Sequence, residues 1–138
     1  MTQTLQEFAQ QKDAQNAISL NIVKYSLMLC DALQQDYQSR YNTGSNCSYG
    51  LDSSGRRYHK IFMYRNGKRD SIHCFIDKKT GSVYKPASIK APAKHERYNL
   101  NIITSREECF KRADWAGSYL YLKNTYYTVT NYQPNHHD

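Results

Sequence analysis

The residues best suited to catalysis are five histidines, four cysteines and twelve acidic side chains. Their spacing matches none of the motifs that position a nucleophile, a general base or a metal ion: the sequence has no Cys-x-x-Cys pair, no His-Glu-x-x-His and no glycine-rich phosphate loop. His136 and His137 have the character of tail residues rather than metal ligands. We therefore expect no catalytic residue, no metal and no cofactor, and we interpret the chain as a binding protein and not an enzyme.

Positive charge is the chemical feature that stands out. The 138 residues carry 19 lysines and arginines against 12 acids, a net charge of +7. Between residues 56 and 97 there are twelve cations and three acids, so this segment has a net charge of +9 and the rest of the chain has −2. A field concentrated in this way favours an anionic partner such as nucleic acid.

A hairpin is predicted in the middle of this basic segment. Asn66 and Gly67 separate two runs of aromatic and branched residues, 57–65 and 69–77, and Asn-Gly between such runs is typical of a two-residue type I′ turn. In that register Phe62 faces Ser71 and Lys60 faces His73. Side chains alternate between the two faces of a strand, and a slip of one residue would exchange them.

The two predicted faces differ in chemistry. One is aliphatic, with His59, Ile61, Met63, Ile72, Cys74 and Ile76. The other combines rings and cations, with Tyr58, Lys60, Phe62, Tyr64, Arg69, Ser71, His73 and Phe75. Rings that stack on bases beside cations that hold phosphates are typical of a single-strand platform. In the alternative interpretation, the C-terminal segment covers this face and the rings form a second core.

A second group of cations follows the hairpin. Lys85, Lys90, Lys94 and Arg97 are spaced by 5, 4 and 3 residues, and Ser88 adds a hydroxyl among small alanines. Such a loop suits phosphate contact, although a solvated basic loop is the alternative. The predicted nucleic-acid or anion-binding residues are therefore Tyr58, Lys60, Phe62, Tyr64, Arg69, His73, Lys85, Ser88, Lys90, Lys94 and Arg97.

These residues need a scaffold, and the pattern predicts a single α+β domain over 1–138. Residues 1–42 are predicted to be helical, as one helix or as two helices broken near 14–19. Residues 57–86 form a three-stranded antiparallel meander, and 87–138 hold the basic loop, a short helix and a Tyr-rich extended C-terminal arm. One apolar stripe at helical spacing should cover the aliphatic sheet face: Ile18, Ile22, Tyr25, Leu29 and Leu33.

Local signals set the expected boundaries. Thr4 and Glu7 form a capping box at the start of the first helix, and the stretch from Asn42 to Gly44 ends it. Residues 43–56 are glycine- and serine-rich and are predicted to be a loop in which Cys47 is the most exposed cysteine. Ser105 caps a short helix that runs to about residue 114. Residues 115–122 form a last strand or an extended arm, and the residues beyond them fray.

The stretch 71–99 resembles a segment that recurs in a family of small uncharacterised proteins encoded by tailed bacteriophages, many of them marine. The resemblance rests on His73, Cys74, Phe75, Asp77, Lys79, Thr80, Gly81, Val83, Lys85, Ala87, Ser88, Lys90, Ala91, Pro92, Ala93, Lys94, Arg97 and Asn99. Ile89 departs from it, because the family usually has tryptophan there. The resemblance implies a phage origin and a setting in the host cytoplasm, and it implies no mechanism.

Three functions remain open at this point. The first is binding of single-stranded DNA or RNA, since no helix is basic enough to read a duplex groove. The second is binding and modulation of a host or phage protein through a Tyr-rich surface, and the third is binding of a small anionic ligand such as a nucleotide. No apolar run approaches the length of a membrane span, and the first residues lack the pattern of a signal peptide.

Overall fold

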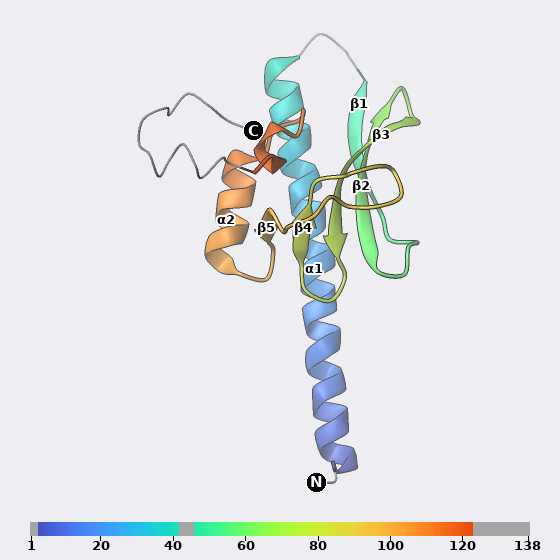
Figure 1. Ribbon diagram of the computed structural model, residues 1–138, viewed down its shortest axis with the longest axis vertical. Coiled ribbons are helices and arrows are strands. Elements are labelled where there is room, and N and C mark those ends of the chain that lie inside the picture. The colour runs from blue at the N-terminus through green and yellow to red at the C-terminus, as the bar shows by residue number, and fades with distance from the viewer. Residues whose placement is uncertain (1–2, 42–45, 123–138) are drawn as a thin grey trace.

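The computed structural model describes residues 3–41 and 46–122, and it has the predicted α+β class (Figure 1). A long helix, α1 (Leu5–Arg40), lies behind an antiparallel sheet, and a short helix, α2 (Ile103–Arg112), stands beside it. A 3-10 turn, η1 (Ser118–Leu120), follows α2.

Within the described residues the sheet has five strands, two more than the meander predicted from the sequence. They follow one another in chain order, and each is antiparallel to the next. The strands are β1 (Cys47–Asp52), β2 (Tyr58–Arg65), β3 (Lys68–Asp77), β4 (Ser82–Tyr84) and β5 (Tyr98–Asn99).

Helix α1 is one continuous helix, and its start is as predicted. The Thr4 hydroxyl accepts from the Glu7 backbone N–H at 3.1 Å, and the Glu7 carboxylate accepts from the Thr4 N–H at 2.9 Å. This capping box satisfies two backbone donors that have no partner inside the helix. The helix ends at Arg40 with Tyr41 as its C-cap, and the expected glycine end at 42–44 lies outside the described residues.

Only the C-terminal half of α1 packs on the sheet. Side chains from residue 3 through residue 21 are exposed, and Figure 1 shows this half projecting away from the rest of the molecule. Ile18, predicted to begin the buried stripe, is 44% exposed. The rest of the stripe is confirmed, because Tyr25 is half-buried and three residues of the stripe join three of the predicted sheet residues in the main core: Ile22, Leu29, Leu33, Ile61, Cys74 and Ile76.

Strand β1 occupies a segment that we predicted to be a loop. A side-chain Cβ at Gly50 would lie 3.0 Å from the Tyr64 ring of the neighbouring strand, so glycine there permits a close approach rather than breaking the strand. Cys47, predicted to be exposed, is buried against Tyr37 and Met63. The other three cysteines are buried as expected.

The hairpin turn is confirmed, but the register holds only next to it. Asn66 and Gly67 have φ angles of 51° and 77°, as a type I′ turn requires. Two irregularities then shift the pairing, so that Met63 pairs with Ser71 and Phe62 pairs with Ile72. Each irregularity leaves one extra residue on β3, which is the signature of a β-bulge.

The second bulge exchanges the two faces around His73. Ile61 pairs with Cys74 while Phe62 pairs with Ile72, so His73 is the unpaired residue between them. His73 was predicted on the outer face, but it is buried on the α1 side. Ile72 was predicted in the core, but it shares the outer face with Phe62 and is only half-buried.

The C-terminal part differs from the prediction in two places. Ser105 does not cap α2, which begins at Ile103 without a side-chain cap, because its hydroxyl accepts the N–H of Asn99 at 2.8 Å. Residues 115–122 form neither a strand nor an extended arm but a turn that leads into η1. The arm expected beyond residue 122 lies outside the described residues.

Candidate functional site

The sheet face turned away from α1 carries the predicted aromatic residues, but its rings are already in contact with protein cations. Phe62 and Phe75 are 2% and 0% exposed. The Arg69 guanidinium lies 3.8 Å from the centre of the Phe62 ring, and the Lys60 ammonium lies 5.3 Å from that of Phe75. These two rings therefore form a second packed layer and offer no free surface for a base.

The remaining residues of this face are also engaged. Tyr58 meets Phe75 edge-on at 5.6 Å, and Tyr64 lies against Gly50. Arg69 forms an ion pair with Asp52 at 3.2 Å and donates to the Tyr64 hydroxyl at 3.3 Å. The cation expected to face a phosphate thus already has a carboxylate partner.

The covering element is the basic loop between β4 and β5 (residues 85–97), which crosses in front of β2 and β3 in Figure 1. Pro86 and Pro92 form a bridge at its base. The Lys60 ammonium donates to the Ile89 carbonyl at 3.0 Å and so joins the loop to the sheet. The face is covered, as the alternative interpretation held, and within residues 3–41 and 46–122 the covering element is this loop; most of the C-terminal segment named in that interpretation lies outside the described residues.

Inside the basic loop, Ser88 shapes the backbone. Its hydroxyl accepts from the N–H groups of Lys90 and Ala91 at 3.1 and 3.2 Å. Lys90 and Lys94 are exposed, and within residues 3–41 and 46–122 their ammonium groups make no hydrogen bond or ion pair. These two lysines are therefore available to an anionic partner.

Arg97, the fourth predicted loop cation, links the basic loop to the segment after α2. Its Nε donates to the Leu120 carbonyl at 2.6 Å, and its Nη1 donates to the carbonyls of Lys94 and His95. The guanidinium thus fastens the end of the basic loop to η1. It positions Lys94 and the turn rather than facing solvent.

A pocket of about 350 Å³ lies where the basic loop meets the free edge of β3, and we call it the β3-edge pocket. Phe75 and Ile76 are the β3 residues that pair with β4, so the β3 segment from Lys68 to Cys74 has no strand on that side within the described residues. The pocket is lined by Met63, Arg65, Asp70, Ser71, Ile72, His73, Lys85, Pro86, Trp115, Ala116, Gly117, Leu120 and Tyr121.

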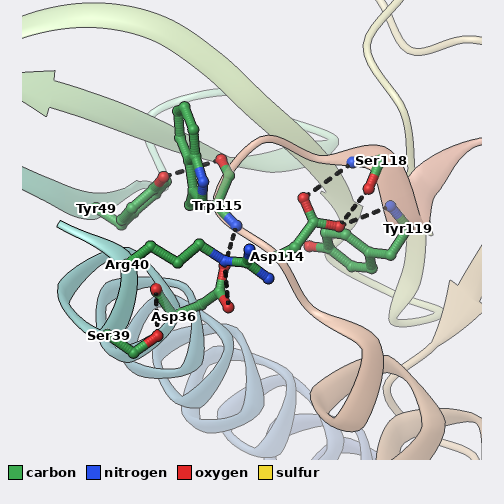
Figure 2. Close-up of polar contacts among 8 residues, drawn as sticks. All are labelled: Asp36, Ser39, Arg40, Tyr49, Asp114, Trp115, Ser118 and Tyr119. Atoms are coloured by element: carbon green, nitrogen blue, oxygen red, sulfur yellow. Dashed lines mark hydrogen bonds and ion pairs between the residues drawn. The ribbon is translucent and has the colours of Figure 1, made fainter.

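One wall of the β3-edge pocket is held by a polar network that ties α1 and β1 to the segment after α2 (Figure 2). The backbone N–H of Trp115 donates to the Asp36 carboxylate at 2.9 Å, and the backbone carbonyl of Trp115 accepts from the Tyr49 hydroxyl at 3.0 Å. The Asp114 carboxylate accepts from the backbone N–H groups of Ser118 and Tyr119 at 3.2 and 3.0 Å. Both sides of Trp115 are therefore fixed by hydrogen bonds.

His73 forms the inner part of the pocket. Its Nε2 is 2.8 Å from the Tyr119 hydroxyl, and its ring meets that of Tyr49 edge-on at 5.7 Å. Burial lowers the pKa of His73 to about 4, while the Asp114 carboxylate raises it by a smaller amount. The imidazole is therefore neutral near pH 7.

The pocket rim combines a cation with an aromatic ring. The Lys85 ammonium lies 4.8 Å from the centre of the Tyr121 ring, which is 51% exposed. On the opposite side Arg65 forms an ion pair with Asp70 at 3.3 Å, and both side chains are exposed. The pairing of ring and cation that we expected on the open sheet face thus exists here, at the edge of β3.

Sequence reasoning named Lys85 but missed the other rim residues, Arg65, Trp115 and Tyr121. Trp115 and Tyr121 lie in a segment we expected to be extended. The residue that could have indicated a turn there is Gly117. It has a φ of 84°, and a Cβ added at this position would lie 3.6 Å from the His73 ring. A glycine there lets the chain turn closely against the sheet.

The remaining reactive side chains are inert or scattered. Burial raises the pKa of the Cys30 and Cys109 thiols to about 12, and burial raises that of Cys74 as well. No group of three His, Cys, Asp or Glu side chains among the described residues has a metal-binding arrangement. None of the helices in the described ranges is long and apolar enough to span a bilayer.

Comparison with known proteins gives a family but no characterised relative. No curated protein and no solved structure matches the chain. One family model, described as a family of unknown function, matches residues 5–122, which include α1, the whole sheet, the basic loop and the β3-edge pocket. The chain therefore belongs to the DUF7717 family.

Proposed function

We propose that this protein binds single-stranded nucleic acid through the basic loop and the adjoining rim of the β3-edge pocket. The observation that carries the proposal is the presence of three cations on one loop: Lys90 and Lys94 are exposed without a carboxylate partner in the described chain, and Lys85 lies over Tyr121. Cations of this kind bind phosphates, and an exposed ring stacks on a base of any sequence.

The electrostatics of the loop support an anionic partner. Residues 85–97 contain four cations and one acid, Glu96. The Glu96 side chain is exposed, and its carboxylate accepts from the neutral side chains of Ser82 and Asn99. Four cations against one acid leave the loop with a net positive charge, and its potential can attract a phosphate chain over a Debye length.

The proposal differs from the one drawn from sequence in its stacking residues. Phe62 and Phe75 are buried beneath Arg69, Lys60 and the basic loop, so Phe62→Ala would lower stability and would not report on stacking. Tyr121 takes that role, because its ring is half exposed beside an ammonium group. In this version Arg69 pairs with Asp52 and covers Phe62, Arg97 positions the basic loop, and neither residue contacts phosphates.

Salt dependence tests the proposal. Lys90→Ala and Lys94→Ala should each weaken binding to single-stranded oligonucleotides of every sequence and lower the slope of log K against log salt by about 1, because each removes one phosphate contact. Fluorescence anisotropy over a salt series measures both effects. Lys12→Ala is the matched control, since Lys12 is an exposed lysine on the projecting half of α1.

The result that contradicts the proposal is equally direct. Binding that is micromolar or weaker to every oligonucleotide at low salt would exclude this function. So would slopes in the Lys90→Ala and Lys94→Ala proteins that equal those of the Lys12→Ala control.

A second candidate function rests on the projecting half of α1. Leu5, Phe8 and Leu20 are 88%, 54% and 70% exposed on the half of α1 whose side chains, from residue 5 to residue 21, are all exposed. Apolar side chains on an exposed helix are typical of binding to another protein, here a host or phage protein. A partner retained after nuclease treatment and lost with Phe8→Ser would favour this function.

The proposal also includes the origin of the protein and the compartment in which it acts. The resemblance of residues 71–99 to a tailed-phage segment supports a phage origin, and we propose that the protein acts without catalysis in the cytoplasm of the host. The basic loop lies inside that resembling stretch, which supports a role in binding.

A further inference from the structure

We infer that the β3-edge pocket holds one unpaired base of the bound strand, with the adjoining phosphate at Lys85. The inference rests on the proposed function and adds a specific subsite to it. The pocket is continuous with the basic loop through Lys85 and Pro86, which line the pocket and also begin the loop. A strand that follows Lys90 and Lys94 therefore reaches the pocket without leaving the basic surface.

The size of the pocket fits a nucleotide. Its volume of about 350 Å³ lies at the lower end of the range for small-molecule sites, which begins at about 300 Å³. A single base with its sugar fills such a space, whereas a stacked pair of bases requires more. The pocket is thus suited to a base that is turned out of the strand.

The free edge of β3 provides hydrogen-bonding groups for the edge of a base. Because Phe75 and Ile76 are the β3 residues that pair with β4, the strand around Ser71 has no neighbour there in the part of the chain that the structure describes. An unpaired strand edge presents backbone N–H and C=O groups in a row. Donors and acceptors side by side match the edge of a pyrimidine or purine, and the Ser71 hydroxyl adds a group of either kind.

Aromatic side chains border the same space. Tyr121 offers a half-exposed ring at the mouth, and Trp115 lines the pocket wall. Trp115 meets the rings of Tyr37 and Tyr41 edge-on, both at 5.4 Å, so packing holds its ring while the hydrogen bonds of Figure 2 hold its backbone. A rigid ring of this kind binds a base with little loss of conformational entropy.

The charges around the pocket place the phosphate at one side. Arg65 is paired with Asp70, so the two together contribute little net charge, whereas no acid lines the pocket near Lys85. A neutral base therefore lies toward Asp70 and His73, and its phosphate lies toward Lys85. Binding is non-covalent, and no bond is made or broken.

The test uses Trp115, the only tryptophan of the chain, as an internal reporter. Thymidine monophosphate should quench its fluorescence in a saturable way, and deoxyribose 5-phosphate should bind about tenfold more weakly because it lacks the stacking base. An oligothymidylate of about 12 nucleotides, a length within the site sizes of single-strand-binding domains, should quench it as well.

Two variants act on the pocket and one serves as control. Ala116→Phe places a ring at the pocket wall, and Tyr121→Leu removes the ring at the mouth. Each should weaken thymidine monophosphate binding by about tenfold while the salt slope of oligonucleotide binding stays unchanged, because no counterion is involved in stacking. Ala14→Phe, the same change at an exposed alanine on α1, should bind as the unaltered protein does. Far-ultraviolet circular dichroism confirms that each variant is folded.

The outcomes separate the two ideas. If both folded pocket variants bind thymidine monophosphate and the oligonucleotide as tightly as Ala14→Phe does, the pocket inference is wrong, and the loop-based function stands. If Lys90→Ala loses oligonucleotide affinity but keeps thymidine monophosphate quenching, both the loop and the pocket are supported. Quenching by the mononucleotide with no oligonucleotide binding at low salt would overturn the strand-binding function and with it the placement of a strand in the pocket.

Discussion

His73, which we predicted on the outer face of the sheet, is buried, and its buried surroundings set its pKa. The imidazole is buried at 8% exposure with the Tyr119 hydroxyl as its polar partner and Asp114 as the nearby carboxylate. Burial disfavours the charged form, and this lowers the pKa to about 4 from the ordinary value near 6.5.

This shift predicts a stability loss in mild acid. The unfolded chain takes up the proton before the folded chain does, so the stabilisation is complete above about pH 6.5 and is lost as the pH falls toward 4. In that window the free energy of unfolding should fall by up to about 1.4 kcal/mol per pH unit. Urea titrations at pH 7 and pH 5 measure the loss.

The His73→Gln protein tests the assignment, because glutamine keeps a donor and an acceptor for Tyr119 but does not titrate. It should lose less stability than the unaltered protein between pH 7 and pH 5. His59→Gln is the control: burial and the nearby Lys78 ammonium also lower the pKa of His59, but by less than burial lowers that of His73. Equal losses in the unaltered and the His73→Gln proteins would contradict the assignment.

At the residue scale, sequence reasoning found the two exposed loop lysines but not the partners of the other cations. The selection of Lys90 and Lys94 as exposed cations required only their charge and their place in a basic stretch of the sequence. The carboxylate that engages Arg69 is Asp52, 17 residues earlier in a segment predicted to be a loop, and the carbonyl that accepts from Arg97 belongs to Leu120. Such long-range pairings have no local signature in the sequence.

At the scale of elements, the bulges in β3 decide which side chains form the core. A type I′ turn fixes the register beside it, and Asn66 with Gly67 made that turn predictable. A bulge adds one residue to a strand without any turn signal, and here two bulges moved Ile72 outward and His73 inward. Strand β1 was missed because Gly50 weakens a strand pattern, although the close ring of Tyr64 favours glycine at that position.

The exchange of faces predicts that alanine substitutions at Ile61 and Ile72 lower the free energy of unfolding by different amounts. Ile61→Ala should lower the free energy of unfolding by roughly 2–5 kcal/mol, because the side chain is fully buried between the sheet and α1. Ile72→Ala should cost about 1 kcal/mol, since its side chain is half-buried on the other face. Urea unfolding of both proteins checks the order, and a larger loss for Ile72→Ala would mean that the unshifted register is correct.

At the scale of the whole molecule, α1 divides into two unlike halves. Its C-terminal half fills the core, while the half from residue 5 to residue 21 projects into solvent (Figure 1). The sequence predicted the helix and its cap, because these depend on local residues. It did not predict the projection, because a helix pattern is the same whether or not a sheet lies beneath it.

Removal of residues 1–15 should therefore leave the fold intact. We expect the free energy of unfolding to change by less than about 1 kcal/mol, because the side chains of residues 3–15 are exposed and Asn16 can cap the shortened helix. Leu20→Ala and Leu29→Ala give a matched pair on the same helix, with a large loss expected only for the buried Leu29. A loss above about 2 kcal/mol on truncation would show that the projecting half is packed in solution.

The division of α1 also has an evolutionary consequence. Folding selects strongly at Ile22, Leu29 and Leu33, where a smaller or polar side chain opens the core. It selects weakly between residues 5 and 21, where every face of the helix meets water and most substitutions leave the fold unchanged. Any side chain that family members retain in that stretch, such as Phe8 or Leu20, would therefore be kept for what it touches outside this chain. The two halves of α1 are therefore under different selection, the C-terminal half for folding and the N-terminal half for contact with other molecules.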